Sequence, residues 1–286
     1  MHCATFLNSN VSHEEREERL NAIHKGEKSI LYIAPEMLLT TSLETLLGGR
    51  RLGLFVVDEA HTVTSWGRDF RADYWFMGDY LERQRKNGLH FPVLCLTATA
   101  VFGGRDDVVQ DTISTLGLNQ PILYLGRVRR DNIDFDIHSL DKQTDESRDE
   151  FKVNHVAQKI AEYVAEGKKT LVYCPFRSTV DSIYQAVPFS VKDKVRRYHA
   201  GMERGEKNAA QDAFKNNKAI VMICTKAFGM GVDVPDIVQV YHYAPTGNLA
   251  DYVQEIGRCA RDKNLRGTAV EEYLPGDLSQ LKRLHG

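Results

Sequence analysis

Two adjacent carboxylates stand directly after an apolar run in the first third of the chain. The run LFVV, residues 54–57, is followed by Asp58 and Glu59, and His61 comes two residues later. Acids at the carboxyl end of a parallel strand suit nucleoside triphosphate chemistry. One carboxylate can hold Mg²⁺ through water, and the other can orient or deprotonate the attacking water. Solvated acids at an ordinary strand end are the alternative that this pattern alone leaves open.

Aromatic and arginine side chains alternate shortly after these acids, in the segment TSWGRDFRADY. Trp66 and Phe70 offer faces on which nucleic-acid bases can stack. Arg68 and Arg71 can contact phosphates or stack on bases. The segment is therefore a candidate nucleic-acid contact, although both rings could instead cover a hydrophobic edge.

Three long polar side chains recur with helical spacing near the end of the chain. Gln254, Arg258 and Arg261 stand at i, i+4 and i+7, which places them on one face of a helix predicted over 248–260. A glutamine and two arginines that point the same way could complete a nucleotide site from across a cleft, because arginine strongly accelerates phosphoryl transfer. A solvated arginine face is the structural alternative.

Apolar, β-branched runs alternate with helical patterns along the whole chain, which predicts an α/β fold with parallel sheets. Ser12 and Glu15 form a capping box at the start of the first predicted helix. The runs are continuously apolar, so their strands should be covered on both faces. The predicted strands are 29–34, 54–58, 93–98, 121–125, 169–174, 219–225 and 237–243. The predicted helices are 13–25, 105–117, 152–166, 203–216 and 248–260.

Composition bounds the possible functions. The chain has 286 residues, a net charge of −2 and five scattered cysteines without CxxC spacing. That charge excludes the global basic field of architectural DNA-binding proteins, so a nucleic-acid site would be a local patch. We expect no zinc site and no membrane span, and a cytoplasmic location fits reduced thiols. The polar stretch 126–150 predicts a domain boundary, since a new α/β series begins after it.

The motifs occur in a diagnostic order. DEAH, residues 58–61, is followed by TVTSWGRDF, LTATA, YCPFRS, RYHAGM, ICTKAFGMGVDVPD and QEIGRCARD. This series resembles the RecQ family of superfamily 2 DNA helicases from about residue 5 to 275. The resemblance implies two RecA-like parallel-sheet domains with ATP in the cleft between them, the first truncated at its N-terminus. The expected segments are a partial first domain at 1–128, a second domain at 129–275, and the start of a truncated C-terminal helix at 276–286.

The resemblance also assigns roles in the first domain. It implies that Asp58 holds Mg²⁺ through water, that Glu59 is the catalytic base, and that His61 links this site to the second domain. Thr97 and Thr99 of LTATA would relay hydrogen-bond changes between the ATP and DNA sites, although threonines can also cap the helix that follows. The loop with Trp66, Arg68, Phe70 and Arg71 would couple DNA binding to hydrolysis.

In the second domain, the resemblance makes Arg261 the arginine finger and Arg258 a γ-phosphate partner. Gly229 and Gly231 would let the backbone approach phosphate and Asp233 would meet the ribose, although Gly229 alone could be a plain turn glycine. Small polar groups and backbone amides would follow the DNA backbone without reading its sequence. The residues concerned are Ser178, His199, Gly201 and Thr225.

Two positions depart from the family pattern. Ala260 stands where the family usually has glycine, and we expect its methyl group to crowd a helix slightly. Met37 stands where the family often has a basic residue, so one phosphate contact is expected to be lost.

ATP hydrolysis in this superfamily requires a Walker A loop, GxxxxGK(S/T), whose amides and lysine hold the β and γ phosphates. No such string occurs in the 286 residues. We therefore expect a helicase core without its first strands, adenine-recognition motif and P-loop, and inactive by itself. The zinc module and winged helix that follow the core in many members are not expected either.

The resemblance implies 3′→5′ unwinding, with ATP and Mg²⁺ as cofactors and single-stranded and forked DNA as partners. Protein partners cannot be named from the sequence. The expected location is the cytoplasm, at the nucleoid in a bacterium, or the nucleus in a eukaryote. Two alternatives stay open. One is a non-catalytic fragment that binds single-stranded DNA or a protein partner, and the other is a related motor that acts on RNA.

Overall fold

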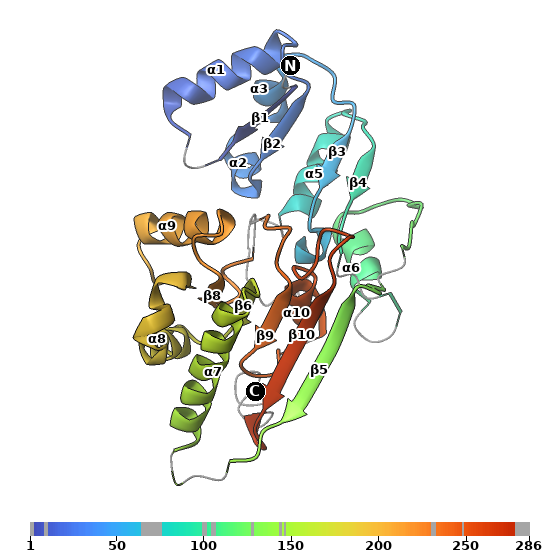
Figure 1. The fold of residues 1–286 in the computed structure, drawn as a ribbon. Helices are drawn as coiled ribbons and strands as arrows, with labels where there is room; N and C mark the ends of the chain where they lie inside the picture. The colour runs from blue at the N-terminus through green and yellow to red at the C-terminus, as the bar shows by residue number, and fades with distance from the viewer. Residues whose placement is uncertain are drawn as a thin grey trace. The chain divides into compact units, whose positions relative to one another are not determined.

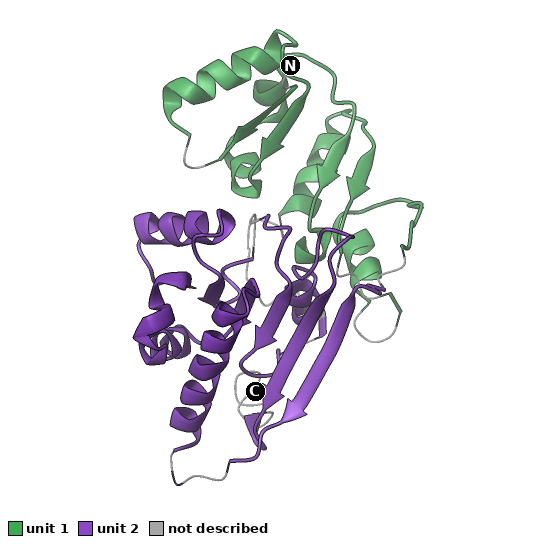
Figure 2. Cartoon of the chain, viewed as in Figure 1, with its two compact units in different colours: residues 1–127 green, residues 128–286 purple. Residues whose placement is uncertain are grey.

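The structure is a computed structural model that describes most of the chain. The chain forms two compact units, Met1–Arg127 and Val128–Gly286, each with its own hydrophobic core (Figures 1 and 2). Among the described residues, no helix is both long and apolar enough to cross a membrane. The described residues are 3–8, 11–63, 76–98, 102–103, 107–126, 129–142, 145, 147–229, 233–247 and 249–277.

Unit 1 contains two small parallel sheets. Strand β1 (Ala4–Leu7) pairs with β2 (Ile30–Ile33), and β3 (Phe55–Val57) pairs with β4 (Val93–Cys95). The helices pack around these strands. They are α1 (His13–His24), α2 (Pro35–Thr40), α3 (Leu43–Leu47), the 3-10 helix η1 (Ala60–Val63), α5 (Met77–Lys86) and α6 (Val108–Thr115).

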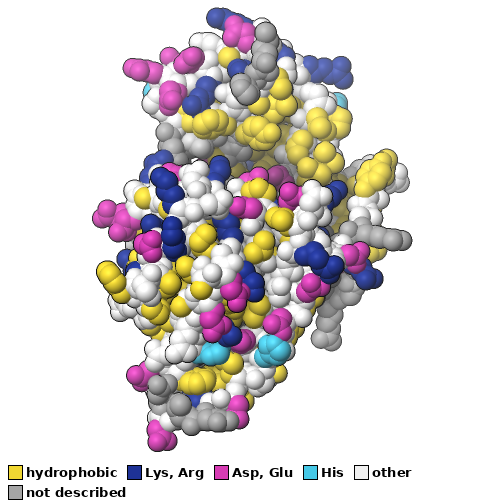
Figure 3. All heavy atoms as spheres, in the orientation of Figure 1, with side chains coloured by type: hydrophobic (Ala, Val, Ile, Leu, Met, Phe, Trp, Pro, Cys, Tyr) yellow, Lys and Arg dark blue, Asp and Glu magenta, His cyan; other side chains and the backbone are white. Residues whose placement is uncertain are grey.

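The strands of unit 1 bury only one of their two faces. Leu7 and Val57 point into a core that also holds Leu81 and Leu116. The alternate positions of the same strands are apolar as well, but they are exposed, and hydrophobic side chains gather over this part of the unit in Figure 3. The exposed residues in and beside the strands are Phe6, Ile30, Tyr32, Leu54, Val56, Leu94 and Leu96.

Unit 2 is built on one six-stranded parallel sheet with the order β5-β10-β9-β6-β8-β7. The central strands are mostly apolar and buried along their whole length, as expected for a parallel sheet covered on both faces. The strands are β5 (Ile133–Ser139), β6 (Thr170–Tyr173), β7 (Val195–Tyr198), β8 (Val221–Cys224), β9 (Gln239–His242) and β10 (Gly267–Tyr273).

Two pairs of helices cover this sheet. Helices α7 (Arg148–Ala165) and α8 (Arg177–Ala186) pack on one face. Helices α9 (Arg204–Lys215) and α10 (Leu249–Ile256) pack on the other. A short 3-10 helix, η2 (Phe189–Lys194), leads into β7. The covering helices explain why both faces of the central strands can be apolar.

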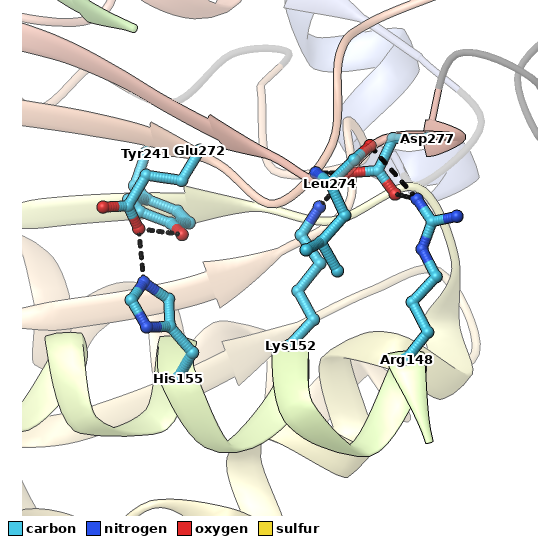
Figure 4. A network of polar contacts seen from close by, with 7 residues as sticks. All are labelled: Arg148, Lys152, His155, Tyr241, Glu272, Leu274 and Asp277. Carbon is cyan, nitrogen blue, oxygen red and sulfur yellow. Dashed lines mark hydrogen bonds and ion pairs between the residues drawn. The ribbon is translucent and has the colours of Figure 1, made fainter. Parts of the chain in front are cut away.

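A polar network joins one face of α7 to the end of the sheet (Figure 4). Lys152, which is 2% exposed, and Arg148 both pair with the buried carboxylate of Asp277. Burial lowers the pKa of Lys152. One turn further along α7, His155 Nε2 lies 2.7 Å from Glu272 on β10. The network therefore fixes the segment after β10 against α7.

The fold class predicted from the sequence is confirmed. The structure also contains every predicted strand but one, although the ends of the strands differ from the predicted ends. Residues 121–125 are the exception, because this segment pairs with no other strand among the described residues and leaves Ile122 and Tyr124 exposed. The capping box is also confirmed, since Ser12 and Glu15 exchange side-chain to backbone hydrogen bonds. Strands β1, β5, β7 and β10 were not predicted.

Candidate functional site

The DEAH acids lie in a tight turn at the carboxyl end of β3. Glu59 has φ 49°, a left-handed conformation that costs a non-glycine residue free energy and that surrounding contacts must hold in place. Its N–H donates to Asp58 Oδ1 at 2.9 Å, and its carbonyl oxygen accepts from the Thr62 hydroxyl at 2.8 Å. The next residue, Ala60, donates its N–H to the Leu96 carbonyl on the neighbouring chain segment. The turn that presents both carboxylates is thus fixed to the segment after β4.

His61 connects the two motifs of unit 1. Its Nδ1 lies 3.4 Å from Glu59 Oε2 and 3.0 Å from the hydroxyl of Thr97. The side chain of Thr97 comes from LTATA, which follows β4, so one imidazole contacts both strand ends. A change in the position of Thr97 would therefore reach the carboxylate of Glu59 through a single side chain. The expectation that His61 links unit 1 to the second domain is not tested by these contacts.

The Asp58 and Glu59 side chains suit a magnesium ion. Both residues are exposed at the strand end, where they can meet a bound nucleotide. Mg²⁺ prefers oxygen ligands and commonly uses one or two carboxylates together with water and phosphate oxygens. Oδ1 of Asp58 accepts the Glu59 N–H, and a carboxylate has two oxygens with several acceptor positions, so Asp58 can also turn an oxygen toward such an ion. The residues present therefore fit the expected metal.

Several predicted site residues lie outside the described residues. They are the four residues of the aromatic loop together with one threonine of LTATA and one glycine of AFGMG, namely Trp66, Arg68, Phe70, Arg71, Thr99 and Gly231. Their predicted roles stay predictions.

The predicted nucleic-acid contacts of unit 2 follow three adjacent strands. Ser178 lies in the first turn of α8 after β6, His199 and Gly201 follow β7, and Thr225 follows β8. Strand β8 pairs with both β6 and β7, so their carboxyl ends lie at one edge of the sheet. Thr225 N–H donates to the Tyr198 carbonyl at 3.2 Å, which joins two of these ends directly. The fold therefore brings this group together.

An arginine that the sequence reasoning did not single out also lies at this edge. A Cβ atom on Gly201 would stand 3.4 Å from Arg177 Nη1 and 3.2 Å from His199 Nδ1. His199 is buried, and its Nε2 lies 3.2 Å from Asp181. Gly201 thus leaves room for the Arg177 side chain beside a fixed histidine. The motif YCPFRS contained the arginine, but only the fold shows that it meets RYHAGM.

The helix-face argument for the arginines is wrong. Helix α10 ends at Ile256, so Gln254 lies in the helix, whereas Arg258 and Arg261 lie in the turns that follow. Arg258 is 8% exposed, and a Cβ atom on Gly229 would stand 2.9 Å from its Nη2. Gly229 therefore makes room for Arg258, as a structural glycine does. The i, i+4, i+7 spacing could not reveal where the helix stops.

Arg261 remains at the surface, next to another predicted site residue. Its Nη1 lies 3.0 Å from Asp233 Oδ1. Between this arginine and the helix, Ala260 is buried and has φ 47°. The expectation that its methyl group crowds a helix is thus wrong, because Ala260 lies in a left-handed turn, the conformation in which glycine is preferred. This turn sets the direction in which Arg261 leaves the backbone.

Two family models match the chain, one in each unit. Residues 2–106 match the DEAD/DEAH box helicase model, and residues 152–263 match the helicase conserved C-terminal domain. The first match contains Asp58, Glu59, His61 and Thr97. The second contains the polar groups that follow β6, β7 and β8 as well as both arginines.

Curated relatives are similar over nearly the whole chain. The probable ATP-dependent DNA helicase RecS of Bacillus subtilis is 34% identical over 91% of this chain and 48% of its own length. The ATP-dependent DNA helicase RecQ of Pasteurella multocida is 30% identical over 98% of this chain and 41% of its own length. The chain thus spans less than half the length of these relatives.

Solved structures share the fold at low sequence identity. The Mycobacterium smegmatis helicase Lhr, bound to single-stranded DNA and AMP-PNP, has a TM-score of 0.71 at 16% identity and covers 95% of this chain and 35% of its own. Saccharomyces cerevisiae Dbp5, bound to RNA and ADP BeF3, has a TM-score of 0.65 at 19% identity and covers 99% of this chain and 68% of its own. Both show the RecA-like fold. The two family models and the curated relatives show that the chain belongs to the RecQ-like family of superfamily 2 ATP-dependent DNA helicases.

Proposed function

We propose that this chain forms the motor region of a helicase that couples ATP hydrolysis to 3′→5′ unwinding of DNA. The observation that carries the proposal is the bridge made by His61, which contacts Glu59 and Thr97 at once. A motor needs such a connection, because a change at the nucleic acid must alter the residues that perform hydrolysis. An ordinary strand end with solvated acids does not need it.

In this proposal, Asp58 holds Mg²⁺ through water and Glu59 orients and deprotonates the water that attacks the γ-phosphate. Mg²⁺, when bound, neutralises charge on the phosphates. The left-handed backbone of Glu59 supports this role, since strained residues persist where neighbouring contacts hold them and are enriched at active sites. The exposed carboxylate can reach a substrate without moving the turn.

Unit 2 would supply the positive charge for the transition state. Arg261 is the proposed arginine finger, and Arg258 and Gln254 are proposed to contact the nucleotide. Arg258 is buried, so it would meet the nucleotide from inside unit 2. Asp233 is proposed to meet the ribose and Gly231 the phosphates. In the present structure Arg261 Nη1 lies 3.0 Å from Asp233 Oδ1.

The edge formed by β6, β8 and β7 is proposed to bind the backbone of single-stranded DNA through Ser178, His199, Gly201 and Thr225, with Arg177 as an added phosphate contact. The aromatic loop with Trp66, Arg68, Phe70 and Arg71 is proposed to stack on bases and to signal DNA binding. Single-stranded and forked DNA are the proposed partners. The proposed location is the cytoplasm, at the nucleoid in a bacterium, or the nucleus in a eukaryote.

The 286-residue chain itself is proposed to hydrolyse ATP negligibly, because it contains no GxxxxGK(S/T) string to position the β and γ phosphates. The same fact favours a second candidate function, a non-catalytic protein that binds single-stranded DNA or a protein partner. Both candidates predict negligible turnover by the purified 286-residue chain, so the version joined to a P-loop-bearing segment, described below, decides between them. DNA-stimulated ATP turnover well above that of a Glu59→Gln control would contradict the inactivity proposal.

The coupling roles are tested in a version of the chain joined to a P-loop-bearing segment. Trp66→Ala is expected to reduce stimulation by single-stranded DNA more than the rate without DNA, because base stacking contributes about 1–3 kcal/mol per base. Arg261→Ala is expected to lower both rates and to leave DNA affinity similar, because the arginine acts on transition-state charge. If both variants lose the two rates in the same proportion, the aromatic loop is structural.

Direction and substrate are tested with the same protein. Duplexes that carry a 3′ or a 5′ single-stranded tail, made of DNA or RNA, are compared for strand displacement. Faster displacement from the 3′-tailed DNA supports the proposal. Displacement that requires an RNA tail would instead support a related motor on RNA.

A further inference from the structure

Arg130, near the start of unit 2, holds the turn that leads into Arg261 through hydrogen bonds. Arg130 Nη2 donates to the carbonyl oxygens of Cys259 at 3.0 Å and Ala260 at 2.6 Å. The guanidinium lies more than a hundred residues away in sequence and only a few residues after the start of unit 2. Hydrogen bonds from a charged donor are stronger than those between neutral groups. Arg130 therefore holds two successive carbonyl groups of the turn.

Asn132 forms further hydrogen bonds to the same turn. Its Nδ2 donates to the carbonyl oxygens of Ala260 and Leu265, both at 3.0 Å. Its Oδ1 accepts from Arg130 Nε at 3.1 Å, so the two side chains also fix each other. Both residues are half-buried, which limits competition from water. The asparagine thus closes the loop between the turn and the start of β10.

Ala260, whose carbonyl oxygen accepts from both Arg130 and Asn132, also has an unusual backbone conformation. Ala260 has φ 47°, is fully buried, and donates its N–H to the Ile237 carbonyl at 2.7 Å. A non-glycine residue stays in this conformation only when its surroundings hold it there. The amide is held from one side by Ile237, and the carbonyl is held from the other by Arg130 and Asn132. Both peptide groups of Ala260 therefore have fixed directions.

The residue that follows depends on this arrangement. The backbone of Arg261 starts at the carbonyl group that Arg130 and Asn132 hold, and its side chain forms an ion pair with Asp233. That pair is exposed, with side-chain exposures of 39% and 79%, so it contributes little to holding the arginine. The backbone turn rather than the ion pair sets where the guanidinium points.

We propose that Arg130 and Asn132 are positioning residues that hold Arg261 in the orientation needed for phosphoryl transfer. The proposal rests on the proposed function of Arg261 as the arginine finger. It adds two residues that act through the backbone of the turn. Neither belongs to the motifs from which the catalytic residues were predicted.

The first experiment uses the 286-residue chain and does not depend on hydrolysis. Amide hydrogen exchange of residues 257–266 is measured in the unsubstituted protein, in Arg130→Ala and in Asn132→Ala, together with the Nε–Hε resonance of Arg261. We expect the amides of this segment to exchange about tenfold faster in both variants. The Arg261 resonance is expected to sharpen as the side chain becomes mobile. A merely structural role would lower thermal stability without this local change.

The neighbouring arginine provides the control. Arg129 has a side-chain exposure of 85% and pairs with Asp131 at the surface. Arg129→Ala is expected to leave the exchange of residues 257–266 unchanged. If Arg130→Ala does not fold, Arg130→Lys carries the test, because one ammonium nitrogen cannot replace the separate Nε and Nη2 atoms from which Arg130 donates to Asn132 and to the two carbonyl groups. Exchange in the Arg130 variants equal to that of Arg129→Ala would overturn the proposal.

The second experiment measures ATP hydrolysis in a version of the chain joined to a P-loop-bearing segment. We expect Arg130→Ala to lower kcat about tenfold and to change KM for ATP by less than twofold. Faster exchange with unchanged kcat would overturn the positioning role. Absence of ATPase in the unsubstituted protein would count against the proposed function instead, since the exchange result stands without it.

Discussion

The strands of the two units differ in how many of their faces are buried. In β6 and β8 every residue is buried, because helices cover both faces of the sheet in unit 2. In β2 and β3 exposed positions alternate with half-buried or buried ones, although the exposed side chains are as apolar as the others. Strands of similar apolar composition therefore lie in different environments in the two units. The difference lies in what covers the strand, which a strand's own sequence does not contain.

The open apolar face of unit 1 has an energetic consequence. Burial of apolar surface contributes about 25 cal/mol per Å² to stability, so a strand with one covered face gains less than a strand with two. Two-stranded sheets are also marginal by themselves. Unit 2 should therefore be the more stable half, and the predictions below test that comparison.

The largest expected effect is a difference between the two units in their resistance to proteolysis. Under limited proteolysis of the 286-residue chain, unit 1 is expected to be digested first, because local stability follows buried apolar contact. A protected fragment that begins near residues 130–150 should remain and should unfold cooperatively. Mass spectrometry of the digestion products identifies the fragment. A resistant fragment that covers residues 1–125 would reverse the comparison.

Core substitutions should differ between the units in the same direction. Phe214 is fully buried in unit 2 and packs edge-on against Phe228. We expect Phe214→Ala to lower the free energy of unfolding by about 3–5 kcal/mol, the usual cost of a large cavity. Leu94→Ala, on the open face of unit 1, should cost less than about 1 kcal/mol because that side chain is 40% exposed. Urea unfolding of both variants measures the two costs, and equal values would contradict the assignment of an uncovered face.

The sequence could predict the covered strands of unit 2 because their apolar runs are continuous. Strands β5 and β10 were not predicted, since IDFDIHS and GTAVEEY both contain charged residues. In β10, one of these residues, Glu272, makes polar contacts with His155 and Tyr241. Residues 121–125 were predicted as a strand but do not form one, and the reason is the opposite. The segment is apolar enough for a strand, but strand propensity without a hydrogen-bonding neighbour does not make one.

The candidate site was predictable as far as residue types go, and less so in its geometry. The acids after β3 and the polar groups after β6, β7 and β8 follow from the rule that ligands bind at the carboxyl ends of parallel strands. The positions of Arg258 and Arg261 do not, because the end of α10 at Ile256 and the left-handed Ala260 depend on distant contacts. Arg130 is the clearest example, since it holds a turn at the far end of unit 2.

A buried ion pair distinguishes unit 2 further. Lys152→Met leaves Asp277 buried with Arg148 as its remaining cationic partner, and we expect a loss of about 3 kcal/mol in the free energy of unfolding. Lys159→Met, which breaks an exposed pair with Glu162 on the same helix, should cost less than about 1 kcal/mol. Chemical denaturation of both variants provides the measurement. Similar costs would show that the network in Figure 4 is not a stabilising feature of unit 2.

The same network predicts a dependence on pH. Burial alone would raise the pKa of Glu272, but hydrogen bonds from His155 and Tyr241 hold that pKa below its ordinary value. A carboxylate with a lowered folded-state pKa contributes stability above the ordinary glutamate pKa of about 4.3, and this contribution is lost as the pH falls through the folded-state pKa. Unfolding measured from pH 7 to pH 3 should therefore show a smaller acid loss in Glu272→Gln than in the unsubstituted chain. Identical pH profiles would contradict this contribution.

The smallest expected effect compares one strained residue in each unit. Glu59 and Ala260 both have left-handed backbones, with φ 49° and 47°, but Glu59 is exposed whereas Ala260 is buried. Glycine removes a conformational cost of about 1–2 kcal/mol at such a position and loses about 0.5–1 kcal/mol through its greater freedom when unfolded. Ala260→Gly should therefore stabilise unit 2 by only about 0.5 kcal/mol. Glu59→Gly should leave the unfolding of unit 2 unchanged, because its turn belongs to unit 1. Thermal unfolding of both variants as 286-residue chains, followed through amide signals of unit 2, tests the pair. Stabilisation of unit 2 by Glu59→Gly would mean that the two units unfold together, and the contrast between them would then describe burial but not stability.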